Sequence, residues 1–317
     1  MAYPLFSPAS TEVNVIPAGK LPVFISSYKN DFQTGVVEVD FHNHSSHHLL
    51  FARGELVNVY RHAGNVERLD PASWFQSIDT SKGKAYLRAL ALTPQAVRLV
   101  KILLEQASVP ASSLPENTNL EEQFQNWINH PTPALVHIRW PSAESLALLP
   151  GDGSPPHYTL FVSDNQILHS AGGMMALYGW KEPCSAVRLL DSTARTPAWD
   201  EYLLHYSFSW MTGHLLERLI DLTGPALVNT VVREINFAAV AHGWNISITG
   251  VNVTDQTIFS SPVDAADVYS RLFEILFRHI DMMVGADLLA VLMRESAIHL
   301  SRPYRSVLQE YLLITPV

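Results

Sequence analysis

Two stretches in the last third of the chain repeat one pattern, and this repeat limits the possible folds more than any other feature. In each stretch a glycine is followed, at the same distance, by an Arg-Glu pair: Gly224 by Arg233-Glu234, and Gly285 by Arg294-Glu295. Apolar residues recur at helical spacing on both sides of each glycine, which predicts a pair of helices that turns there. Such pairs bury their apolar stripes against each other. We therefore expect a small helical bundle at the C-terminal end.

The first helix of each pair is expected to be rich in aromatic residues and to cover residues 202–222 and 268–283. Residues 245–259 lie between the two helix pairs. Their apolar side chains alternate with a period of two around polar turns, which predicts an inserted β-hairpin.

Two segments in the first two thirds of the chain also share one order of elements, namely a helix, an alternating strand, a polar loop and a hairpin. In the first copy these are expected at residues 21–32, 35–41 and 49–60, with the turn at Arg53-Gly54-Glu55. In the second copy they are expected at residues 120–128, 134–140, 141–156 (the loop) and 158–170. We interpret the similarity as an internal duplication.

The remaining signals set the predicted limits of the domains. Residues 85–93 predict a strand, and residues 94–106 a helix with proline at its first position. Residues 107–119 contain Pro and Ser without an apolar period, which is typical of a linker. The sequence thus predicts an α+β fold with the following parts: a first α+β module (1–106), a linker (107–119), a second related module (120–195) and a helical repeat domain (196–317).

Composition narrows the classes of partner. The formal net charge is -9 and no Lys/Arg cluster is present that could follow a phosphate backbone, so we do not expect a nucleic-acid partner. Cys184 is the only cysteine, which excludes an internal disulfide and fits a reducing compartment. The sequence shows neither a signal peptide nor a membrane span. We expect a cytoplasmic protein.

A histidine cluster is the clearest candidate for a metal site: His42, His44, His47 and His48. Imidazoles two residues apart on a strand project from the same face and could share a transition metal. The alternative is that these residues are polar groups at a strand end that face water, and the second copy has no matching cluster.

Aromatic residues of the C-terminal helices are candidates for a ligand pocket: Tyr202, Tyr206, Phe208, Trp210, Tyr269 and Phe273. At helical spacing such residues are also typical of a hydrophobic core. The repeated Arg233, Glu234, Arg294 and Glu295 are candidates for ion pairs across the bundle.

No local motif indicates catalysis or a cofactor. Cys184 lacks a recognisable histidine partner, and burial as a small apolar residue is the simpler interpretation. The glycines of residues 169–173 do not form a nucleotide-binding loop and predict a turn instead. Asp152 and Asp164 could be considered as a catalytic pair of carboxylates. Both lie among Gly, Ser, Pro and Asn residues, where acidic side chains are typical of turns. We assign no catalytic residue and no cofactor.

Residues 34–39 (TGVVEV) followed by 50–57 (LFARGELV) resemble the PATAN-type domain of bacterial signalling proteins. The resemblance is confined to residues 21–78. It implies a regulatory or adaptor module that acts by protein contacts, and it implies no catalytic residues. The second copy departs from this pattern, because it has Asp164 where the first copy has Gly54.

These observations lead to one expected function and two alternatives. We expect a non-enzymatic cytoplasmic signalling adaptor or scaffold that binds other proteins, with a homodimer through the helices as one form of contact. The first alternative is a small-molecule or metal-binding sensor that uses the aromatic-rich helices. The second is an enzyme without a recognisable local motif.

Overall fold

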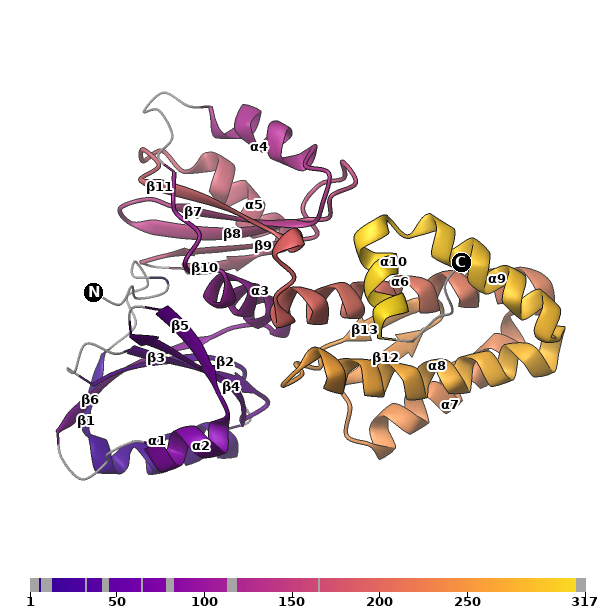
Figure 1. Cartoon of the computed structure of the whole chain (residues 1–317), viewed down its shortest axis with the longest axis horizontal. Coiled ribbons are helices and arrows are strands. Elements are labelled where there is room, and N and C mark those ends of the chain that lie inside the picture. Colours follow the sequence, from indigo (N-terminus) through magenta and orange to yellow (C-terminus); the bar gives the residue numbers. More distant parts are fainter. Residues whose placement is uncertain are drawn as a thin grey trace. The chain divides into compact units, whose positions relative to one another are not determined.

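The computed structural model describes residue 6 and residues 13–31, 33–41, 46–63, 65–77, 83–112, 119–164 and 166–311. It mixes helices and strands, which confirms the expected α+β class. The chain forms two compact units, Met1–Thr196 and Pro197–Val317 (Figure 1). The predicted start of the helical domain at residue 196 lies next to this division.

The first sheet of the N-terminal unit has six antiparallel strands in the order β1-β6-β2-β3-β4-β5. Their bounds are Asn14–Pro17 (β1), Gly35–Asp40 (β2), Ser46–Ala52 (β3), Glu55–Ala63 (β4), Asn65–Leu69 (β5) and Lys84–Ala91 (β6). Helices α1 (Leu21–Asn30) and α2 (Pro71–Ser77) contribute Leu21, Ile25 and Trp74 to a core that covers one face of this sheet.

The second sheet has five antiparallel strands in the order β10-β9-β8-β7-β11. Their bounds are Ala134–Arg139 (β7), Ala143–Leu149 (β8), Tyr158–Ser163 (β9), Gln166–His169 (β10) and Ala186–Asp191 (β11). Helices α4 (Leu120–Ile128) and α5 (Ser170–Gly179) cover one face through Phe124, Ile128 and Leu177.

The two sheets have matching topologies, which supports the duplication but changes its alignment. The order β6-β2-β3-β4-β5 corresponds to β11-β7-β8-β9-β10. In each set a helix, α2 or α5, comes directly before the strand that is last along the chain, β6 or β11. The β3–β4 hairpin therefore corresponds to β8–β9. The match between the Gly54 turn and the Asp164 turn is wrong by one strand, since the second of these turns joins β9 to β10.

Strand β8 lies inside the segment predicted to be a loop, so that prediction is wrong for residues 143–149. All seven of its residues are buried. Strand β8 is buried on both faces and reads AESLALL, so apolar and polar side chains do not alternate along it, and its neighbouring Pro, Gly and Ser residues dominate the sequence signal.

Helix α5 corrects the turn predicted at residues 169–173, because the helix starts at Ser170 and includes both glycines. A Cβ atom at Gly173 would lie 2.8 Å from the carbonyl oxygen of Thr159 on β9. The glycine therefore allows the helix to approach the sheet closely, a contact that local sequence does not reveal.

Helix α3 (Pro94–Glu105) lies between elements of both sheets and begins as predicted, after an N-cap hydrogen bond from Ala96 N–H to Thr93 Oγ1. The Tyr60 hydroxyl of β4 donates to Glu105 Oε1 at 2.8 Å. At the same end of the helix, Gln106 Nε2 donates to the Asp191 carbonyl of β11 at 3.0 Å. Of the predicted linker, Ser112 pairs with Val187, and residues 113–118 lie outside the described residues.

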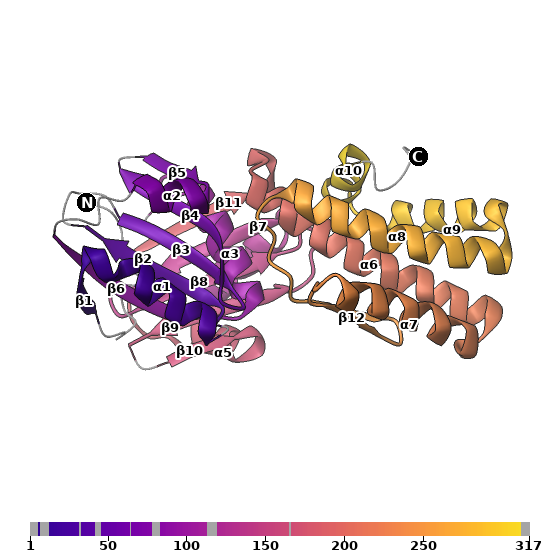
Figure 2. The same ribbon diagram turned by 90° about the horizontal axis from the view of Figure 1, so that it is seen from below.

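The C-terminal unit contains the two predicted helix pairs and the predicted hairpin. Its elements are α6 (Pro197–Thr223), α7 (Pro225–Ala241), β12 (Ile246–Thr249), β13 (Asn252–Asp255), α8 (Pro262–Val284), α9 (Ala286–His299) and α10 (Arg302–Glu310). Helix α10 was not expected. Helices α7 and α9 each pack on both α6 and α8 and lie on opposite sides of them (Figure 2). In the described part of the chain, no helix combines the length and apolar character needed to cross a membrane.

The glycines that join the helix pairs adopt one conformation. Gly224 has φ 85° and ψ 162°, and Gly285 has φ 84° and ψ 159°. Residues other than glycine essentially do not occupy this region, and forcing one into it costs about 1–3 kcal/mol. The repeated glycines are therefore required by the backbone of the two tight connections.

We expect Gly224→Ala and Gly285→Ala each to lower the free energy of unfolding by about 1–3 kcal/mol. A Cβ atom at either position would meet open space, so the loss comes from the backbone and not from a clash. Chemical denaturation of the full chain measures the effect. Gly172→Ala is the control, because Gly172 lies in helix α5 with equally open surroundings, and it should be neutral or slightly stabilising. Equal effects at all three positions would contradict the explanation.

Candidate docking surface on the C-terminal helices

The centre of the C-terminal unit shows how the two helix pairs are related. When the repeats are matched by Gly224 and Gly285, Phe208 of α6 corresponds to Tyr269 of α8. The two rings stack on each other with centroids 4.4 Å apart and an interplanar angle of 13°, and both are buried. Contact between equivalent residues is what a two-fold relation between the repeats produces. Helices α6 to α9 of this unit form a four-helix arrangement with internal pseudo-symmetry, and α10 packs on α6.

The repeated glutamates lie near equivalent positions of the other repeat. Glu234 of α7 binds His279 of α8, with Oε2 and Nε2 2.6 Å apart. Glu295 of α9 approaches Arg218 of α6, with Oε2 and Nη2 3.8 Å apart. His279 and Arg218 occupy the same position in the two repeats. The predicted ion pairs thus involve the glutamates, and each links the second helix of one repeat to the first helix of the other.

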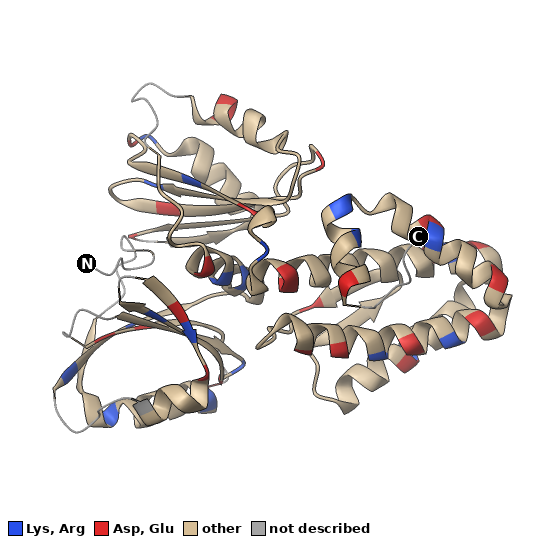
Figure 3. Ribbon diagram, viewed as in Figure 1, with Lys and Arg blue, Asp and Glu red and all other residues tan. Residues whose placement is uncertain are grey.

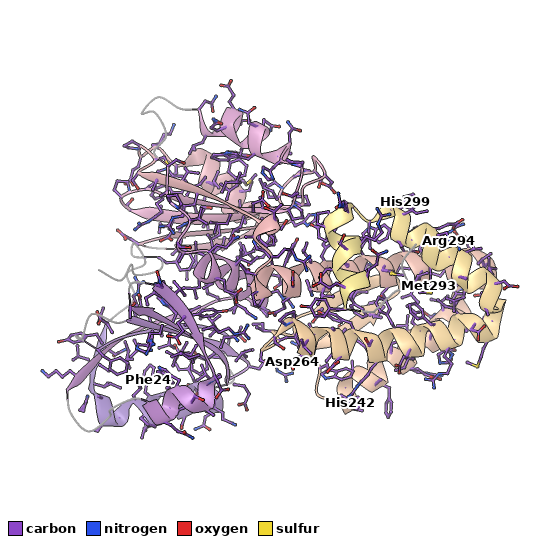
Figure 4. All side chains as sticks on the ribbon, in the orientation of Figure 1. Phe24, His242, Asp264, Met293, Arg294 and His299 are labelled. Atoms are coloured by element: carbon purple, nitrogen blue, oxygen red, sulfur yellow. The ribbon has the colours of Figure 1, made fainter. Side chains whose placement is uncertain are left out.

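The repeated arginines have no such role. Arg233 and Arg294 are exposed, and neither makes a hydrogen bond or ion pair with any described residue. Arg294 is labelled on α9 in Figure 4. Acidic and basic residues both occur along α8 and α9 (Figure 3), so the arginines are not part of a broad basic surface.

A large apolar side chain lies one helical turn after each arginine and faces solvent. Phe237 on α7 is 75% exposed, and the equivalent Ile298 on α9 is 57% exposed. Residues four apart lie on one face of a helix, so each arginine and its apolar neighbour form a continuous surface. We call Arg233 with Phe237 the α7 face and Arg294 with Ile298 the α9 face. Val240, which is 75% exposed, extends the α7 face by a further turn.

The structure distributes the aromatic ligand-pocket candidates among different places. Phe273 packs on Phe208, with ring centroids 5.1 Å apart, so both belong with Tyr269 to the interior of the bundle. Trp210 instead stacks on His214, and Tyr206 packs on Tyr304 of α10. Tyr202 is buried, with its ring close to those of Trp199 and Tyr206. The candidates do not converge on one cavity.

The described histidines of the proposed metal cluster point to opposite faces of β3. His47 accepts a hydrogen bond from Trp74 Nε1 at its Nδ1 atom, 2.9 Å away on the helix-covered face. His48 lies on the other face, 3.3 Å from Glu38 Oε1. His42 and His44 lie outside the described residues, which contain no group of three or more potential ligands able to hold a metal ion. Imidazoles two residues apart on a strand share a face, but His47 and His48 are adjacent and therefore lie on opposite faces.

Each sheet carries a buried Glu–His–Arg cluster on the face opposite its covering helices. In the first sheet Glu38, His48 and Arg88 lie side by side on β2, β3 and β6, and Arg88 Nη2 donates to Glu38 Oε2 at 2.8 Å. Burial alone would raise the pKa of Glu38, but its hydrogen bonds and the charges of His48 and Arg88 lower it. In the second sheet His137 Nε2 lies 2.6 Å from Glu144 Oε1, and both side chains are buried. Sequence analysis missed both clusters, because their members come from strands that pair only in the fold.

The histidines of the first sheet predict a loss of stability in mild acid. Burial lowers the pKa of both His47 and His62 from 6.5 to about 4. Between these values the unfolded chain binds protons that the folded chain does not, so the free energy of unfolding should fall as the pH falls from about 6.5 to about 4. Chemical denaturation at pH 7 and pH 5 measures this difference. In the variant His47→Gln/His62→Gln the difference should be smaller, and an unchanged difference would contradict the assignment.

The contacts and exposure of Cys184, Asp152 and Asp164 are those of ordinary structural residues. Cys184 is half-buried, burial raises the pKa of its thiol, and Sγ donates to the Ala186 carbonyl. Asp152 accepts hydrogen bonds from the backbone and hydroxyl of Ser154, as a turn residue does. Asp164 is exposed at the β9–β10 turn.

Comparison with protein-family models, with curated proteins and with solved structures found no match in any of the three.

Proposed function

We propose that this chain is a non-enzymatic signalling adaptor or scaffold that acts through protein–protein contacts, and that the α7 and α9 faces bind its partner. The observation that carries the proposal is a repeated pair: an exposed arginine without a partner among the described residues, next to an exposed large apolar residue. The neighbouring glutamate of each repeat pairs at the bundle surface with a residue of the other repeat. The arginine and the apolar residue are not needed there.

The chemistry of the two faces defines the partner. Arginine and aromatic residues are enriched at the energetically important centres of interfaces. A guanidinium without an ion pair is complementary to a carboxylate, which it can bind through two parallel hydrogen bonds. The partner should therefore present a carboxylate about one helical turn from an apolar side chain. The N-terminal sheets would then serve as a regulatory part of the adaptor, as the PATAN resemblance implies.

A defined peptide ligand tests this proposal. Peptides are selected from a random displayed library against the immobilised full chain, and the binding of the selected peptide is measured by calorimetry. Arg233→Glu/Arg294→Glu should weaken binding at least tenfold, about 1.4 kcal/mol. Arg271→Glu/Arg278→Glu is the control, because it makes the same charge change at exposed positions of α8. Equal losses in both variants, or no loss in the first, would overturn the proposal.

A further inference from the structure

The pseudo-symmetry of the C-terminal unit indicates how many docking sites the proposed function involves. We infer that the α7 and α9 faces are two equivalent docking sites, so that one chain holds two copies of the same partner segment. This inference rests on the proposed function, since it assumes that the faces bind protein. It adds the number of sites and their common specificity.

The two faces share their basic residue and their large apolar residue at matching positions. Matching the repeats by Gly224 and Gly285 aligns the exposed residues in these pairs: Ala226 with Asp287, Asn229 with Ala290, Arg233 with Arg294, and Phe237 with Ile298. The basic and the large apolar positions keep their character, while the positions near the helix starts differ. A segment with one carboxylate and one apolar side chain at the right spacing fits both faces.

The scaffold holds both faces in the same way. Each carrier helix starts at a glycine of the same conformation, and its glutamate lies near an equivalent residue of the other repeat, Glu234 near His279 and Glu295 near Arg218. Each arginine is therefore displayed from a helix of the same orientation within its own repeat. Equivalent support for equivalent side chains gives two sites of one kind.

Both sites can be filled at once. Helices α7 and α9 pack on opposite sides of α6 and α8 (Figure 2). Packed helix axes are about 8–10 Å apart, so a layer of helices separates the two faces. A segment on one face does not obstruct the other. Two occupied sites would let the chain bring two copies of the partner together.

The two faces should nevertheless differ in strength. Phe237 offers a larger apolar surface than Ile298, and Val240 extends the α7 face. Asp287 at the start of the α9 face repels a carboxylate of the partner, whereas its counterpart Ala226 is neutral. We expect the α7 face to bind the common segment more tightly.

Stoichiometry tests the inference with the same selected peptide. Native mass spectrometry and calorimetry should show two peptides bound to the full chain, one to Arg233→Glu, one to Arg294→Glu and none to the double variant. The affinity that remains in Arg233→Glu should be the weaker of the two. Binding of one peptide that only one substitution removes would overturn the equivalence of the faces and leave the docking function standing.

Other results identify a failure of the proposed function itself. Peptide binding that is unaffected by either substitution would show that neither face is a docking site. Self-association of the full chain, seen by sedimentation and abolished by Arg233→Glu/Arg294→Glu, would assign the faces to a second copy of the chain and overturn the inference. Circular dichroism of each variant confirms that the helices are retained.

Discussion

Glu144→Gln should lower the free energy of unfolding by about 1–3 kcal/mol, because it takes a charged acceptor away from the buried His137 and a counter-charge away from the half-buried Arg139 and Arg188. Glu144 is 0% exposed and lies 2.6 Å from His137, which is 1% exposed. It also acts on Arg139 and Arg188, whose pKa values are lowered by burial and raised by the charge of Glu144. Glutamine keeps the shape of the side chain and removes only the charge. The loss should therefore be electrostatic.

An exposed ion pair of the same type provides the matched control. Glu234 and His279 are also 2.6 Å apart, but the glutamate is 50% exposed. Exposed pairs typically contribute about 0–1 kcal/mol, so Glu234→Gln should have a small effect. Chemical denaturation of the two variants compares them directly. Similar losses would show that burial does not decide the strength of these pairs.

Replacing the buried pair with two apolar residues separates charge from packing. His137→Leu/Glu144→Leu removes both members of the buried pair, while Arg139 and Arg188 still lose the charge of Glu144. A loss of stability smaller than that of Glu144→Gln would assign the effect to the unpaired His137, and an equal loss would assign it to the two arginines. If the double variant loses more stability than Glu144→Gln, the interaction between His137 and Glu144 itself stabilises the second sheet.

Phe208→Ala should lower the free energy of unfolding of the C-terminal unit by about 3–5 kcal/mol. Phe208 is 1% exposed and packs against Tyr269 and Phe273, so its removal opens a cavity where the two repeats meet. The surrounding helices can close such a cavity only in part. The expected loss of stability is large because the Phe208 ring lies where the two repeats pack against each other.

Phe237→Ala controls for the loss of an aromatic side chain from the same unit. Phe237 is 75% exposed, and surface substitutions usually change stability by less than about 0.5 kcal/mol. The same variant should weaken binding of the selected peptide at the α7 face. A stable protein with reduced peptide binding would show that Phe237 serves binding, whereas Phe208 serves core packing. A large loss of stability would instead show that Phe237 belongs to the core.

Sequence patterns predict the helical unit well because its signals are local. The glycines, the prolines that begin α7 and α8, and the apolar periodicity act within a few residues of each helix end. Patterns predict the N-terminal strands less completely. Strand β8 has no alternation, and the pairing of β11 with β7 joins segments that are far apart in the sequence.

The candidate docking surface likewise combines features that local sequence predicts with features that depend on tertiary contacts. The recurrence of Arg-Glu after each glycine is visible in the sequence and identifies α7 and α9 as related helices. Nothing in the sequence indicates that the glutamates pair with His279 and Arg218 of the other repeat while the arginines have no partner among the described residues. Adjacent residues on a helix point in different directions, and only the positions of the neighbouring helices decide which of them finds a partner.

The sequence by itself determined the α+β class, the two helix pairs that turn at glycines, the hairpin between them and the identity of the repeated residues. These features depend on backbone preferences and on short-range periodicity. Only the tertiary structure decided the alignment of the duplicated sheets, the opposite directions of His47 and His48, the buried pair of His137 and Glu144, and the exposure of Arg233 and Arg294. Those features depend on long-range contacts, since burial and pairing are properties of the neighbours that a fold places around a residue and not of the residue itself.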